Sequence, residues 1–305
     1  MYKRQVFGST SPPSAADGKA VFAGFDNEEN PTLGGLYLAN LKGGKNLDTL
    51  VEIGGQVPGV RGETFRRIGE AVSFDGTMVG FWGAWGEETT PVKLYCPTEG
   101  NKDRIDYCNK NLVCEDGSGP MGDGKSECDD IGCYQVKQVP ANQGIFVHDT
   151  SGKGSTRMVA STPDVFSDFV FWNYSGKPPC AGVNGHGQEG AEDDGEPARW
   201  RSSAFVAVSG PYTAFKAAAD DRVGIYIESA AGRAMWTVLD TTMNGNLLES
   251  YPEAQNWKIT EVGLEREGLR ANHLAINAKM NIEGGTEEDG MAGVYLTHVP
   301  IPPRR

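Results

Sequence analysis

The segment 114–130 contains the residue types that would bind a hard cation. It alternates carboxylates with glycine and serine and has a cysteine at position 114 and another at position 128. Ca²⁺ takes about six to eight oxygen ligands of this kind, although the spacing does not match an EF-hand loop. The alternative is a solvated loop tied by disulfides. The predicted ligands are Asp116, Asp123, Asp129 and Asp130.

Four tryptophans are candidates for ligand binding. A flat aromatic ring next to polar donors suits a sugar, and binding pockets are usually lined by aromatic side chains. The alternative is that these indoles fill contacts in the core. The four predicted residues are Trp82, Trp85, Trp172 and Trp200.

The chain contains residue types used in acid–base catalysis, but no sequence motif places them in one catalytic site. His148 and Asp149 are adjacent in a predicted strand, where neighbouring side chains point to opposite faces. No Gly-x-Ser-x-Gly motif occurs. A lyase or glycosidase needs two carboxylates about 5–10 Å apart, or a basic side chain beside a cation. A base could come from Tyr226 or His273, and the cation from Arg222. The sequence therefore leaves enzymatic activity open.

Six cysteines predict disulfides. Five of them lie between residues 96 and 133, in a polar stretch that cannot build its own core and needs covalent ties. A zinc site fits less well, because no paired C-x2-C motif or nearby histidine completes it. Up to three disulfides are expected, with the connectivity open. The cysteines are Cys96, Cys108, Cys114, Cys128, Cys133 and Cys180.

Pairs of acidic residues precede several predicted strands. If the intervening loops emerge on one face, they form an acidic surface that could hold Ca²⁺ or a cationic partner. The alternative is the ordinary surface of an acidic protein. The pairs are Glu28-Glu29, Glu87-Glu88, Asp220-Asp221 and Glu287-Glu288-Asp289.

Two repeated patterns predict the elements that position these residues. Asp17-Gly18 and Asp75-Gly76 each precede an alternating apolar strand, as in tight hairpins. A glycine followed by aliphatic, aromatic and aliphatic residues recurs at 35–38, 144–147, 224–227 and 293–296, and the first three copies lead into a hairpin. Further strands are expected at 65–68, 166–172 and 257–262. The pattern predicts about four units of four strands.

This order of turn, strand, acidic loop and Gly-Leu-Tyr-Leu strand resembles the repeats of TolB-like propellers and of uncharacterised secreted bacterial proteins. The resemblance implies an all-β β-propeller of about four units, complete or part of a larger ring, and implies little about function. We expect a single domain over 6–305 with a disulfide-rich insertion at about 96–140 and a polar one at 175–200. Residues 1–5 are similar to adaptor read-through.

The net charge of −13 disfavours nucleic acid and anionic membranes as partners. No apolar run approaches the roughly 20 residues of a membrane helix. With the cysteines, this predicts an extracellular or periplasmic protein. The expected function is a carbohydrate- or surface-binding module, with Ca²⁺ as a candidate cofactor. The alternatives are a polysaccharide-active enzyme and a non-catalytic scaffold for protein interactions.

Overall fold

The computed structural model describes residues 7–27, 30–43, 47–110, 126–152, 154–162, 164–178, 197–230, 234–282 and 290–299. Within these ranges the chain is all-β, as predicted, with antiparallel sheets. The helical segments of the described residues are α1 (Lys102–Cys108) and the short 3₁₀ turns η1 (Gly245–Leu247) and η2 (Pro252–Asn256). None of them is long and apolar enough to cross a bilayer.

The chain forms two compact units. Unit 1 contains Met1–Glu88, Pro140–Val170 and Ala204–Arg305, and unit 2 contains Thr89–Val139 and Phe171–Ser203. Almost all of the two stretches that the sequence marks as insertions, 96–140 and 175–200, falls in unit 2.

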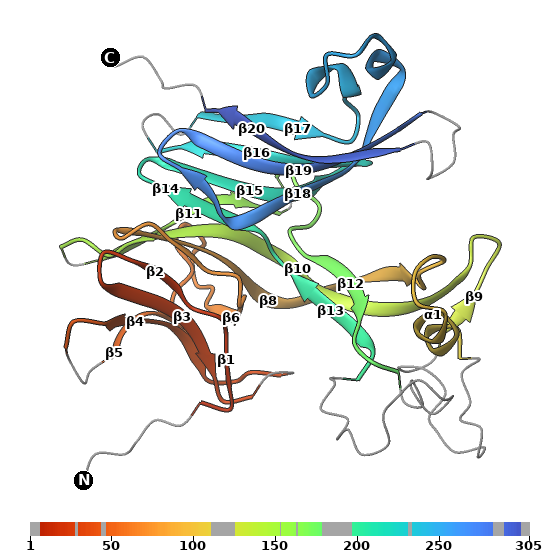
Figure 1. Cartoon of the computed structure of the whole chain (residues 1–305). Helices are drawn as coiled ribbons and strands as arrows, with labels where there is room; N and C mark the ends of the chain where they lie inside the picture. Colours follow the sequence, from red (N-terminus) through yellow and green to blue (C-terminus); the bar gives the residue numbers. More distant parts are fainter. Residues whose placement is uncertain are drawn as a thin grey trace, which may run out of the picture. The chain divides into compact units, whose positions relative to one another are not determined.

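Unit 1 is built around four antiparallel sheets, each formed by strands from one stretch of the chain (Figure 1). The first sheet contains β1 (Ser9–Thr10), β2 (Ser14–Ala16), β3 (Lys19–Phe25), β4 (Gly34–Asn40) and β5 (Leu47–Glu52). The second contains β6 (Phe65–Ile68), β7 (Ser73–Phe74), β8 (Met78–Tyr95), β9 (Glu127–Cys128), β10 (Cys133–Asp149) and β11 (Ser155–Ser161). Strand β8 runs from unit 1 into unit 2, β9 lies in unit 2, and β10 returns to unit 1.

The other two sheets follow in the C-terminal part of the chain. The third has the order β14 (Val206–Ser209), β15 (Tyr212–Ala219), β16 (Arg222–Ser229) and β17 (Ala234–Asp240). The fourth has the order β18 (Trp257–Arg270), β19 (His273–Ile282) and β20 (Met291–His298). A separate ribbon in unit 2 consists of β12 (Phe171–Ser175) and β13 (Arg199–Ser203).

Both predicted Asp-Gly turns are confirmed. Asp17 and Gly18 have φ of 51° and 74° and join β2 to β3, so the hairpin needs residues that tolerate the left-handed region. At the second turn, the Asp75 carboxylate accepts hydrogen bonds from the backbone N–H groups of Thr77 and Met78, at 2.9 and 2.7 Å. This side-chain bonding closes the loop from β7 to β8.

The four Gly-aliphatic-aromatic-aliphatic segments lie in β4, β10, β16 and β20. In the first three, the pairing with the next strand shifts register between the aliphatic and the aromatic residue, a β-bulge at the same place each time. A Cβ at Gly35 would lie 2.0 Å from the Val51 carbonyl oxygen, and one at Gly144 would lie 2.6 Å from that of Ala160. The glycine therefore allows the neighbouring backbone to approach.

Four details of the expected strand arrangement differ in the structure. The strand at 65–68 exists, but it pairs with β8 instead of completing the first sheet, because residues 53–64 turn it toward the next hairpin. Residues 166–170 are not a regular strand: Asp168 forms an isolated antiparallel bridge with Ala218, and regular pairing begins only at Phe171. The strand from Trp257 opens the fourth sheet rather than closing the third. Glu87-Glu88 lies within β8 and not in a loop.

One strand of each sheet contacts a strand of the next sheet. Strand β2 contacts β7, β7 contacts β14, and β14 contacts β18. The hydroxyl of Ser14 accepts from Phe74 N at 3.0 Å and donates to Glu267 Oε1 at 2.6 Å. The hydroxyl of Ser73 accepts from Val208 N at 3.1 Å and donates to the Arg266 carbonyl at 2.7 Å. Two buried serines thus link β2, β7, β14 and β18.

We expect Ser73→Ala to lower the free energy of unfolding by about 2 kcal/mol, because it leaves a buried N–H and a carbonyl without partners. Urea denaturation measures this. Ser203→Ala, at an exposed position of β13, is the control and should stay within about 0.5 kcal/mol of the wild type. Equal stability of the two variants would show that the Ser73 linkage contributes nothing.

Candidate functional site

Three aromatic side chains share one face of the β12–β13 ribbon in unit 2. The register pairs Trp172 with Ser202 and Tyr174 with Trp200. Directly paired residues lie on the same face, and so do residues two apart on one strand. Trp172, Tyr174 and Trp200 therefore form one aromatic face, which we call the ribbon face.

The disulfide-bonded core of unit 2 supports part of this face. Tyr174 is buried in a cluster with Cys96, Tyr107 and Cys108, and Trp200 packs against the same cluster. The rings of Tyr174 and Trp200 meet edge to face, with centroids 5.2 Å apart. Such contacts hold the aromatic planes in a fixed orientation.

The indole N–H groups of Trp172 and Trp200 find no acceptor among the residues that the structure describes. Both Nε1 atoms are buried. An unsatisfied buried donor costs about 1–3 kcal/mol, so such groups normally have a role. Both unpartnered donors lie on the same face of the ribbon.

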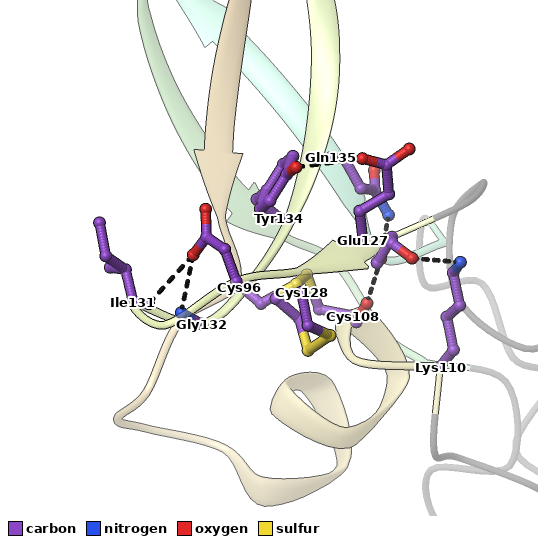
Figure 2. Close-up of a disulfide and its surroundings, with 12 residues drawn as sticks. Cys96, Cys108, Lys110, Glu127, Cys128, Ile131, Gly132, Tyr134 and Gln135 are labelled. Atoms are coloured by element: carbon purple, nitrogen blue, oxygen red, sulfur yellow. Dashed lines mark hydrogen bonds between the residues drawn. A yellow bond between two sulfur atoms is a disulfide. The ribbon is translucent and has the colours of Figure 1, made fainter.

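Two disulfides organise the rest of unit 2 (Figure 2). Cys96 at the end of β8 is bonded to Cys108 at the end of α1, and Cys128 is bonded to Cys133, its partner in the β9–β10 pairing. The two bonds confirm four of the predicted disulfide cysteines and indicate a non-reducing environment. Cys114 and Cys180 lie outside the described residues.

Hydrogen bonds fix the hairpin next to these disulfides. The Ser126 hydroxyl donates to the Cys108 carbonyl at 2.7 Å, and the Tyr134 hydroxyl donates to Glu127 at 3.0 Å. Asn101 caps the start of α1: its side chain accepts from Arg104 N at 3.0 Å. The Ser126 bond ties the end of α1 to the residue before β9, and the Tyr134 bond links β10 to β9, as Figure 2 shows.

Asp129, one of the predicted calcium ligands, is engaged by its own hairpin. One carboxylate oxygen accepts from Lys93 Nζ and the Tyr95 hydroxyl, each at 3.0 Å. The other accepts from the backbone of Ile131 and Gly132, at 3.0 and 3.3 Å. Four donors occupy the lone pairs that a cation would need, so Asp129 holds the turn in this structure.

The other predicted ligands add little to a metal site. Asp130 is exposed next to Asp129, and Asp116 and Asp123 lie outside the described residues. Over the part of the chain that the structure describes, no three acidic, histidine or cysteine side chains gather closely enough to hold a metal.

The hydrogen bond from Lys93, more than any other interaction, lowers the pKa of Asp129 to about 2. Because the folded pKa lies below the ordinary value near about 3.9, the carboxylate stabilises the hairpin above that pH. The stabilisation is lost as the pH falls toward 2. An NMR titration of the Asp129 carboxyl should have its midpoint near 2 in the wild type. Lys93→Met should raise it, and Lys102→Met, which removes a partner of Asp106, should not.

Trp82 and Trp85 lie in the core of unit 1. The Trp82 indole donates to Gln143 Oε1 at 2.9 Å, and Trp85 packs edge to face on Phe146 at 6.0 Å. Both side chains are buried. Neither presents a ring to solvent, so the ligand-binding hypothesis continues with Trp172 and Trp200.

Of the candidate catalytic types, the structure brings Tyr226 and Arg222 together. The Tyr226 side chain is buried, and Arg222 is 3.7 Å from the buried carboxylate of Asp240. Burial raises the pKa of Tyr226, and the Arg222 charge opposes that rise. His148 is elsewhere, bonded to Thr156 Oγ1 at 2.8 Å, with its pKa lowered by burial.

The predicted acidic surface is only partly described. Asp220-Asp221 forms the turn between β15 and β16, as expected, whereas Glu87 in β8 pairs with Arg66 at 2.7 Å. The pairs at 28–29 and 287–289 lie outside the described residues.

Comparison of the sequence with protein-family models and with curated proteins finds no match.

The structure adds one feature that the sequence analysis missed, the ribbon face itself. Its signal is present: Trp-Asn-Tyr-Ser at 172–175 alternates aromatic and polar residues, and Arg-Trp-Arg at 199–201 places one aromatic residue between polar ones. Two such runs around one loop are typical of a hairpin.

Proposed function

We propose that the chain is a secreted carbohydrate-binding protein whose ribbon face contacts the sugar. The observation that carries this proposal is the pair of buried, unpartnered indole N–H groups of Trp172 and Trp200 on one face. Sugar hydroxyls and ring oxygens are acceptors for such donors, and the apolar face of a sugar stacks on an aromatic ring. Tyr174, fixed against the disulfide core, supports the same surface.

The charge of the chain favours a neutral glycan. A net charge of −13 repels polyanions such as sulfated or uronic acid polymers, and the repulsion grows at low salt. Uncharged polysaccharides avoid this cost. We therefore expect neutral chains to bind more tightly than anionic ones in the same buffer.

We also propose that unit 1 is a four-unit propeller that presents this binding unit. Strands β2, β7, β14 and β18, one from each sheet, touch in succession, and Ser14 in the first sheet reaches Glu267 in the last; both observations support a closed ring. The bulge shared by β4, β10 and β16 supports a repeated unit. The resemblance to TolB-like repeats agrees with this architecture.

Trp172→Phe and Trp200→Phe should each weaken binding of a neutral polysaccharide about tenfold. Each change removes an N–H donor worth about 1.4 kcal/mol or more but keeps an aromatic ring. Trp236→Phe, at a half-buried position of β17 in unit 1, is the matched control and should bind as the wild type does. Wild-type affinity in both ribbon variants would contradict the proposal.

The binding assay also separates the alternatives. Co-sedimentation with neutral and anionic polysaccharides is read together with the release of new reducing ends, with calcium and with chelator. Binding without new ends supports the proposal, and loss of binding in chelator would add Ca²⁺ to it. New ends would favour a polysaccharide-active enzyme, and Tyr226 beside Arg222 would be the first residue to test. No binding would contradict the proposal and favour a scaffold for protein interactions.

A further inference from the structure

Two histidines far apart in the sequence face each other across the β19–β20 ladder. The antiparallel register places His273 directly opposite His298. Their ring centroids are 4.4 Å apart, and the ring planes are inclined at 58°. Both side chains are exposed, so neither is held there by burial in a core.

The backbone around the pair is ordered by the fold. Next to the pair, the Val299 N–H donates to the Asn272 carbonyl at 2.8 Å, which extends the ladder beyond His298. The turn before His273 contains Ala271 with φ of 51°, and Ala271 N is held by the Ser209 hydroxyl at 2.8 Å. Both Cα atoms are therefore positioned before any ligand binds, and only the side-chain torsions have to adjust.

The separation of the rings suits chelation. A metal–nitrogen bond of about 2.1 Å puts an imidazole centroid about 3.2 Å from the metal. Two such rings at roughly a right angle, as in tetragonal coordination, are about 4.5 Å apart. The observed 4.4 Å matches this value. Imidazole nitrogen is a preferred ligand of Cu²⁺, Ni²⁺ and Zn²⁺.

We propose that His273 and His298 form a two-histidine binding site for a divalent transition metal. Affinities should follow the general order of these ions, with Cu²⁺ bound more tightly than Ni²⁺ or Zn²⁺. No third acidic, histidine or cysteine side chain joins them among the described residues. The remaining coordination positions therefore belong to water or to an external ligand, and the site is open rather than structural.

The test is calorimetric titration of the tag-free chain with CuCl₂. The wild type should bind one equivalent with a micromolar or tighter dissociation constant. His273→Ala and His298→Ala should each weaken that binding about 100-fold, because each converts a chelate into a single ligand. His186→Ala removes a histidine outside the described residues and should leave the affinity unchanged. Circular dichroism of each variant checks the fold.

Electron paramagnetic resonance supplies a second readout. The Cu²⁺ complex of the wild type should show coupling to two imidazole nitrogens, and either single variant should show one. The proposal is overturned if the wild type shows no saturable binding, or if both single variants bind Cu²⁺ as the wild type does.

Discussion

Glu228→Gln is expected to destabilise unit 1 by about 3 kcal/mol, one of the two largest effects that the structure predicts. Glu228 on β16 accepts two hydrogen bonds from the Arg157 guanidinium on β11, at 2.9 and 2.8 Å. The Glu228 side chain is 3% exposed and that of Arg157 is 28% exposed. The glutamine amide has no negative charge to balance the Arg157 guanidinium. That charge is then left uncompensated where it has only partial access to water. The pair joins the second sheet to the third, so the melting temperature should fall by about 6–12 °C.

Glu87→Gln is the matched control, because it makes the same chemical change in an exposed pair. Arg66 and Glu87 are 2.7 Å apart, but their side chains are 57% and 81% exposed. Exposed pairs contribute about 0–1 kcal/mol, so this variant should melt close to the wild type. The double variant Arg157→Met, Glu228→Leu should be more stable than Glu228→Gln, since it leaves no buried charge. Similar melting of the two Glu→Gln variants would contradict this account of the pair.

Removal of the Cys96–Cys108 disulfide is expected to unfold much of unit 2 and leave unit 1 folded. The bond closes a sequence separation of 12 residues, for which the loss of chain entropy in the unfolded state contributes about 3 kcal/mol. Cys108 is fully buried, and the cluster around it includes Tyr174 of the ribbon face. In Cys96→Ser, Cys108→Ser, hydrogen exchange should become fast in α1 and in β12–β13, whereas β14–β17 stay protected.

The second disulfide provides the comparison for this experiment. Cys128–Cys133 closes only five positions in an exposed hairpin, where entropy contributes about 2 kcal/mol. Its removal should speed exchange in β9 and the adjoining part of β10 and leave β12–β13 protected. If both double variants unfold unit 1 as well, the division of the chain into two separately stabilised units is incorrect.

Short motifs in the sequence predicted the Asp-Gly turn and the glycine-led strands, because the geometry of these parts depends on the residues at those positions. Asp17-Gly18 marks its hairpin because few residues tolerate its backbone angles, and the repeated glycine marks strands whose neighbour comes close. The pairing partner of β6 was not predictable in this way. Four residues with two buried positions fit either neighbouring sheet, and long-range packing decides between them.

The candidate site was predictable only in its residue types. Trp172 and Trp200 were chosen for their aromatic rings, but so were Trp82 and Trp85, which lie in the core. Exposure depends on which strands cover a side chain, and one sequence does not reveal that. The His273–His298 pair depends on the register between β19 and β20, which a shift of one residue would abolish.

The most direct test of the carbohydrate-binding proposal is to observe the six indole N–H groups by ¹H–¹⁵N NMR while a neutral oligosaccharide is added. Assignment comes from single Trp→Phe variants. The proposal predicts that the Trp172 and Trp200 signals shift with a common saturation curve, because their free donors gain sugar acceptors. The Trp82 signal, already bonded to Gln143, should not move. Saturable binding that shifts other indoles and leaves Trp172 and Trp200 unchanged would contradict the proposed site.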